Sequence, residues 1–134
     1  MDEKFMQRYR SYKKSLLAMS DAGKQDLGNS YVMSGIGSKF NITFELAWKV
    51  MKDILVQYYS INNFVTGSPK ETLRAARSAG LIYDERWMAM LTLRNLLSHD
   101  YDGEIIRKSC DTIINEYIDL FSDFQHSVET LLCE

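Results

Sequence analysis

Four side chains that can do chemistry stand within eight consecutive residues, namely Arg94, Asn95, His99 and Tyr101. An arginine can hold a phosphate through a planar fork of N–H donors. A histidine can take up or release a proton near neutral pH, and an asparagine can position a hydroxyl or stabilise a developing oxyanion. Together these groups suit metal-free cleavage of RNA, in which the 2′-hydroxyl attacks the neighbouring phosphate.

The spacing of Arg94 and His99 is weak evidence by itself, because such a pair arises by chance in many chains of this size. Its position makes the pair more informative, since it lies inside an otherwise apolar helical pattern, where a cationic group must be paired with an anion or have a function. Cleavage of this kind needs both an acid and a base, and one histidine supplies only one of them. A symmetric dimer that brings together two copies of the surface carrying Arg94 and His99 would supply both the acid and the base.

The composition is that of an ordinary globular protein, which we expect to form one domain over residues 1–134. The net charge of −2 gives no overall attraction to nucleic acid, so any contact with RNA must be local. No apolar run approaches the ~20 residues of a membrane span, and the N-terminus lacks the apolar core of a signal peptide. Cys110 and Cys133 match no metal-ligand spacing. We therefore expect a cytoplasmic protein with reduced thiols, no metal, no cofactor and no membrane contact.

Apolar residues recur at helical spacing along nearly the whole chain. Three stripes of such residues each predict one long amphipathic helix. They are Phe5, Tyr9, Tyr12, Leu16 and Met19, then Phe40, Phe44, Ala47, Met51, Ile54 and Tyr58, then Ile106, Cys110, Ile113, Tyr117, Leu120, Phe124, Val128 and Leu131. Residues 21–30 are polar and residues 61–67 interrupt the pattern, so we expect both to be connections.

A short helix and a fourth long helix are predicted between the second and third stripes. Ser68 can cap the short helix, Glu71 completes a capping box, and Gly80 suits its end. Asp84 can cap the next helix, which runs through the motif toward a break at residues 102–103. The sequence therefore predicts an all-α fold, an antiparallel up-and-down bundle of four long helices and one short helix.

The helix that carries the motif divides into two arcs at about 100° per residue. The arc expected to face the core contains Ala89, Met90, Leu93, Leu96 and Leu97. The other arc contains Arg94, Asn95, Ser98 and His99 together with Trp87, Met88 and Leu91. A solvated face would be richer in lysine and glutamate, whereas this mixture is typical of an interface or a cleft. We therefore expect Trp87, Leu91 and Ser98 to line a cleft beside the catalytic candidates.

Structural roles are the alternative for several of these residues. Arg94 can form an ion pair with a carboxylate on another helix, and His99 can be a favourable cation at the C-terminal end of its own helix. Trp87 is of a type found more often in a core or an interface than in a ligand cage. Glu45 and Lys49 have the spacing of an i,i+4 pair. A basic face on the short helix, either solvated or phosphate-binding, consists of Lys70, Arg74 and Arg77.

Several blocks of sequence stand in a recognisable order. They are Phe44-Glu45-Leu46-Ala47-Trp48-Lys49, Ser68-Pro69-Lys70-Glu71 leading to Ala79-Gly80-Leu81-Ile82, Trp87, and Arg94-Asn95-Leu96-Leu97-Ser98-His99-Asp100-Tyr101. In this order they resemble the nucleotidyltransferase substrate-binding protein family, which belongs to the HEPN superfamily of helical bundles. The resemblance covers roughly residues 40–130, and the blocks together are far more specific than the arginine–histidine spacing.

The resemblance implies a homodimer and a partner, a separately encoded minimal nucleotidyltransferase (MNT). It implies that Arg94 and His99 are catalytic residues of a metal-independent endoribonuclease, that Asn95 is the polar residue following the arginine, and that two motifs meet across the dimer. In HEPN–MNT toxin–antitoxin pairs the motif extends to Arg-x4-His-x-Tyr. There the nucleotidyltransferase transfers AMP to the tyrosine and silences the toxin, and Tyr101 occupies that position here.

Two other functions remain open at this point. The substrate-binding branch is named for presenting substrate to the nucleotidyltransferase, a non-catalytic role in which Arg94 would hold phosphate and Trp87 or Tyr101 would contact a base or the partner. The other is a purely structural bundle with a buried ion pair. Transfer of AMP to Tyr101 also requires the helix to end by about His99, because a regular helix would turn Tyr101 toward the core.

Overall fold

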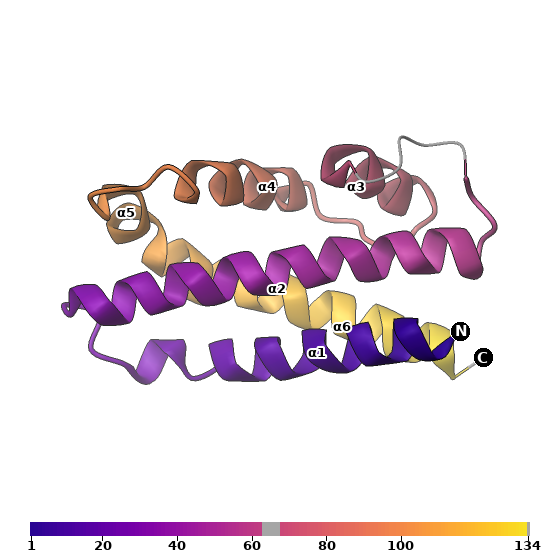
Figure 1. Cartoon of the computed structure of the whole chain (residues 1–134), viewed down its shortest axis with the longest axis horizontal. Helices are drawn as coiled ribbons and strands as arrows, with labels where there is room; N and C mark the ends of the chain where they lie inside the picture. The colour runs from indigo at the N-terminus through magenta and orange to yellow at the C-terminus, as the bar shows by residue number, and fades with distance from the viewer. Residues whose placement is uncertain (63–67, 134) are drawn as a thin grey trace.

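The computed structural model describes residues 1–62 and 68–133, and every regular element in these ranges is helical. In chain order the elements are α1 (Glu3–Met19), the 3₁₀ turn η1 (Ala22–Lys24), α2 (Ser30–Gln57), α3 (Pro69–Ser78), α4 (Arg86–Leu97), α5 (Glu104–Thr112), the π-helical segment η2 (Ile113–Tyr117) and α6 (Ile118–Leu132). Figure 1 shows that α1, α2, α4 and the run from α5 to α6 alternate in direction, with the short α3 beside the end of α2. The predicted all-α bundle of four long helices and one short helix is confirmed.

Helix α1 carries the first predicted stripe, and all of its members are buried, namely Phe5, Tyr9, Tyr12, Leu16 and Met19. The helix begins after Asp2, whose carboxylate accepts a hydrogen bond from the amide of Phe5 at 2.8 Å. It packs against α2 and α6. The buried hydroxyl of Tyr12 donates to the carbonyl oxygen of Phe121 at 2.6 Å, so this polar atom is satisfied inside the core.

Helix α2 is central to the bundle and contacts α1, α3, α4 and α5. It begins after Asn29, whose side chain accepts hydrogen bonds from the amides of Tyr31 and Val32. The predicted stripe is confirmed for Phe40, Phe44, Ala47, Met51 and Ile54, which are all buried. Tyr58, the last member, is 44% exposed, because the helix ends at the preceding residue.

The predicted start and stop of α3 are confirmed, whereas α4 begins at Arg86, near the predicted cap Asp84, but ends at Leu97, before the predicted break at residues 102–103. Ser68 accepts a hydrogen bond from the amide of Glu71 at 3.4 Å, and Gly80 follows α3 with a φ of 79°, which favours glycine. The carboxylate of Asp84 accepts a hydrogen bond from the amide of the first residue of α4 at 2.9 Å. This local bond helps to fix where α4 begins.

The connections join these helices. The predicted connection at residues 21–30 is confirmed, and it contains the turn η1, whose Ala22 is buried. Of the second predicted connection, residues 61–67, residues 63–67 lie outside the described residues. No helix in the described part of the chain is both long and apolar enough to span a bilayer.

The third predicted stripe is confirmed along α5, η2 and α6 as far as Val128, and its last member, Leu131, is half-buried. Its buried members are Ile106, Cys110, Ile113, Tyr117, Leu120, Phe124 and Val128. The run is not a regular α-helix throughout, because the five residues of η2 are π-helical. Where α5 crosses α2, a Cβ added to Gly37 would lie 3.1 Å from Cδ1 of Ile106. The absence of a side chain at this position lets the two helices approach each other closely.

Candidate functional site

Helix α4 buries two residues that we predicted to lie beside the catalytic candidates. Trp87 is only 3% exposed, and its ring centroid lies 5.7–6.2 Å from the rings of Phe44, Phe121 and Phe124. Leu91 is 8% exposed. The prediction that Trp87 and Leu91 share an exposed cleft with the catalytic candidates is therefore wrong, since both residues belong to the core.

The opposite error concerns Ala89 and Leu96, which we predicted to face the core. Ala89 is exposed, and Leu96 is 49% exposed. The buried residues of α4 are Trp87, Met90, Leu91 and Leu93, so the predicted core positions of Met90 and Leu93 are confirmed. With the half-buried Arg94, positions 87, 90, 91 and 94 have the i, i+3, i+4 and i+7 spacing of a stripe on one helical face. Burial of a large indole removes more apolar surface from water than burial of an alanine or one leucine, so Trp87 sets the rotation of the helix.

Arg94 lies at the end of this stripe and forms an ion pair with Glu45 of α2. One terminal nitrogen of its guanidinium lies 2.7 Å from Oε2 and 3.1 Å from Oε1 of Glu45, and the other donates to Oδ1 of Asn95 at 3.0 Å. The side chains of Arg94 and Glu45 are 29% and 33% exposed. These bonds occupy at most three of the five N–H donors of the guanidinium, so donors are left for a phosphate.

Glu45 is the functional candidate that sequence reasoning missed. We predicted a pair between Glu45 and Lys49, but the carboxylate binds Arg94, and the ammonium of Lys49 lies 5.9 Å from the centre of the Trp48 ring. Two signals were present in the sequence, namely that Arg94 can pair with a carboxylate on another helix and that Glu45 belongs to the block of residues 44–49. The carboxylate fixes the direction of the guanidinium, which makes Glu45 a positioning residue for Arg94.

His99 and Tyr101 follow the end of α4 and are both accessible to solvent. The helix ends at Leu97, so the condition for exposure of Tyr101 is met. His99 is exposed, Tyr101 is 90% exposed, and their ring centroids are 6.4 Å apart. Ser98 is also exposed, although its hydroxyl donates to the carbonyl oxygen of Asn95 at 2.6 Å.

The turn after His99 is held by the carboxylate of Asp100. Its two oxygens accept hydrogen bonds from the amides of Ile105 and Ile106, both at 2.9 Å. A carboxylate at the N-terminus of a helix is favourable because it meets unpaired N–H groups and the positive end of the helix dipole. Asp100 therefore ties the motif to the first turn of α5, a role that the sequence pattern did not reveal.

The structure thus gathers Arg94, Asn95, Ser98, His99 and Tyr101 at one end of α4. The basic face of α3 is not part of this group, because α3 lies near the opposite end of α4 (Figure 1). In α3, Arg74 pairs with Glu71 at 2.6 Å, and Arg77 pairs with Glu85 at 3.3 Å. These half-exposed pairs favour an ordinary solvated face over a phosphate site.

Known proteins share this sequence and fold. Residues 7–130 match the model of the family described as nucleotidyltransferase substrate binding protein like. A Haemophilus influenzae protein named probable ribonuclease HepT is 35% identical over 103 residues, which cover 72% of this chain and 70% of that protein. The solved structure of HI0074 from Haemophilus influenzae, described as the fold of a substrate binding domain of a nucleotidyltransferase, matches with a TM-score of 0.66 and 26% identity over 93% of this chain and 96% of that one. The chain therefore belongs to the nucleotidyltransferase substrate binding protein like family.

Proposed function

We propose that this chain is the HEPN-type partner of a minimal nucleotidyltransferase and acts as a metal-independent endoribonuclease that AMP transfer silences. One observation carries the proposal: an exposed histidine stands within two turns of an anchored arginine and directly beside an exposed tyrosine. The relative named probable ribonuclease supports the nuclease activity. The family name, which refers to nucleotidyltransferase substrate binding, supports the partnership with a nucleotidyltransferase.

In this mechanism Arg94 holds the scissile phosphate and Asn95 positions the attacking hydroxyl. His99 takes the proton of the 2′-hydroxyl, the 2′-oxygen forms a bond to phosphorus, and the bond from phosphorus to the 5′-oxygen breaks. The leaving oxygen takes a proton from the second His99 of a dimer, in its protonated form. The products are a cyclic phosphate and a free 5′-hydroxyl.

The outer face of α4 is the surface on which we place the dimer contact. Its exposed residues are uncharged from position 88 to position 98, and they include Ala89, Thr92, Asn95 and Leu96. An uncharged helix face with an exposed leucine is depleted in the residues that disfavour burial in an interface. A two-fold contact along this face would place the two copies of His99 at the same interface.

Replacing Leu96 with aspartate is expected to convert a dimer into a monomer, because the contact would bury an unpaired carboxylate. Sedimentation velocity at micromolar concentration measures this change. Leu17→Asp is the matched control, since Leu17 is 71% exposed on α1, and α1 lies on the other side of α2 from α4 (Figure 1). A wild-type protein that sediments as a monomer at that concentration would contradict the dimer.

Modification of Tyr101 adds a negative charge beside His99 and fills the approach to it. We expect the neighbouring nucleotidyltransferase, with ATP and magnesium, to add the mass of one adenylyl group to the wild-type chain, as measured by intact-mass spectrometry. Tyr101→Phe is expected to gain no mass, whereas Tyr31→Phe, which alters another exposed tyrosine, is expected to gain it fully. If the wild-type mass stays unchanged although the partner enzyme is active, the proposed silencing by AMP transfer is wrong.

A non-catalytic subunit that presents substrate to the nucleotidyltransferase is the second candidate. The Arg94–Glu45 pair suits it, because an anchored guanidinium with donors to spare can hold a phosphate without taking part in a reaction. Absence of AMP transfer to Tyr101 and absence of RNA cleavage would together select this candidate.

A further inference from the structure

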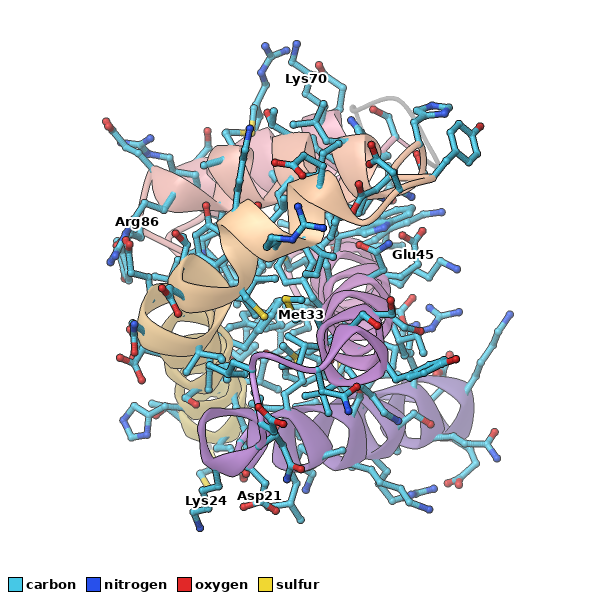
Figure 2. The ribbon with its side chains drawn as sticks, turned by 90° about the vertical axis from the view of Figure 1, so that its left-hand side faces the viewer. Asp21, Lys24, Met33, Glu45, Lys70 and Arg86 are labelled. Atoms are coloured by element: carbon cyan, nitrogen blue, oxygen red, sulfur yellow. The ribbon has the colours of Figure 1, made fainter. Side chains whose placement is uncertain are left out.

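A groove lies directly beside Tyr101, between α2 and the turn that joins α4 to α5. Its cavity volume is about 520 Å³, and Tyr101 and Arg107 form part of its lip. Figure 2 looks onto this end of the bundle and shows Met33 between α2 and the last helical run. Small-molecule sites usually have volumes of roughly 300–1,000 Å³, so the groove is large enough for a mononucleotide.

One wall of the groove is polar and belongs to α2. Ser34, Ser38 and Asn41 follow one another at spacings of four and three, so they share one face of the helix. The side-chain oxygen of Asn41 is buried and has no hydrogen-bond partner among the described residues, a state shared only with the indole nitrogen of Trp48. A buried acceptor without a donor is costly, so rotation of the Asn41 amide toward a ligand in the groove that brings an N–H donor is favoured.

An adenine is the base that fits this requirement. An asparagine amide can bond adenine in a bidentate manner, accepting from the exocyclic amino group and donating to the neighbouring ring nitrogen. The floor of the groove is apolar and is lined by Met33, Leu97 and Ile106, which suits the flat face of a purine. The serine hydroxyls can bond the ribose hydroxyls.

The lip of the groove suits the phosphate. Arg107 pairs with Glu104, but both side chains are about half exposed, and such surface pairs contribute little free energy. Its guanidinium is therefore available to a phosphate. The nearby acidic side chains are turned toward α5, because Asp100 binds two backbone amides and Asp102 accepts a bond from the amide of Glu104 at 3.1 Å.

We propose that this groove is an adenine-nucleotide subsite that receives the adenylyl group after its attachment to Tyr101. The inference rests on the proposed function. In the attachment step the tyrosine oxygen forms a bond to the α-phosphorus of ATP, the bond to pyrophosphate breaks, and the phenolic proton passes to solvent. The attached adenosine then folds back along α2, with its base at Asn41 and its phosphate at the lip. The modification is thereby held against its own chain and shielded from hydrolysis.

The test is a titration of the unmodified, full-length protein with AMP, followed by amide signals in ¹H–¹⁵N NMR spectra. We expect AMP to shift the signals of Ser34, Ser38 and Asn41 at concentrations where UMP and inorganic phosphate do not. Asn41→Leu is expected to weaken AMP binding at least tenfold. Asn62→Leu is the matched control, because Asn62 is exposed and lies outside the groove lining. Equal shifts with UMP, or no shift with AMP, would overturn the subsite.

Two results separate this inference from the proposed function. If the mass measurement shows an adenylyl group on Tyr101 while the groove signals of that modified protein stay unchanged, the subsite is wrong and the silencing step stands. If free AMP binds at Asn41 while an active partner leaves Tyr101 unmodified, the subsite stands and the silencing step fails.

Discussion

Replacing His99 with alanine is expected to lower the rate of RNA cleavage by about 10²–10⁴-fold, which is the usual contribution of a general acid or base. The free energy of unfolding is expected to change by less than about 0.5 kcal/mol, because the ring is exposed beside the Tyr101 ring. Single-turnover cleavage of a labelled RNA in the presence of a chelator measures the first quantity, and urea denaturation measures the second.

His126→Ala is the matched control, since His126 is exposed on α6 and takes no part in the site. Arg94→Ala is expected to reduce cleavage as His99→Ala does, while costing about 1 kcal/mol or less in stability, because the Arg94–Glu45 pair is partly solvated. Full activity in both His99→Ala and Arg94→Ala would exclude the nuclease mechanism. A loss of several kcal/mol in Arg94→Ala with unchanged cleavage would instead support a structural ion pair.

Replacing Trp87 with alanine is expected to lower the free energy of unfolding by about 3–5 kcal/mol, because it removes a buried aromatic side chain and leaves a cavity. The indole contacts the rings of Phe44, Phe121 and Phe124, which come from α2 and α6, so its loss weakens the packing of three helices. Urea denaturation followed by circular dichroism measures the loss.

Leu17→Ala is the control for Trp87→Ala, and its effect is expected to stay within about 0.5 kcal/mol, because the leucine side chain is 71% exposed. A loss below about 1 kcal/mol in Trp87→Ala would contradict the buried position of the indole. Such a small loss would support the exposed position of Trp87 that helical periodicity predicted.

Periodicity predicted α1 and the last helical run well because each has one apolar stripe and one polar face. In α1 the stripe from Phe5 to Met19 is buried throughout. Helix α4 is different, since large apolar residues occur on every side of it, and a 100° step then leaves its rotation undetermined. Contacts with other helices decide the rotation, and here the aromatic neighbours of Trp87 do so.

The candidate site was predictable only where it depended on neighbouring positions in the chain. Arg94, Asn95 and His99 stand in one local pattern, so they lie together as expected. The partner of Arg94 lies 49 positions away on α2, and no local pattern specifies a pair between two helices. The sequence also did not predict the hydrogen bonds between Asp100 and α5, because they depend on the geometry of a tight turn.

The π-helical segment η2 limits how this chain can change in length. In a π-helix each amide reaches back five residues instead of four, so η2 contains one residue more than a regular α-helix would need for the same turns. Deleting one residue between positions 113 and 117 would restore a regular α-helix and leave the rotation of α5 relative to α6 nearly unchanged, whereas adding one residue would rotate α5 by about 100°. With such an added residue, Ile106 would lose its close contact with Gly37, and the amides of Ile105 and Ile106 would point away from the Asp100 carboxylate. Evolution can therefore lengthen or shorten the surface connections of such a chain and can lose the extra residue of η2, but a residue added to this segment would displace the motif.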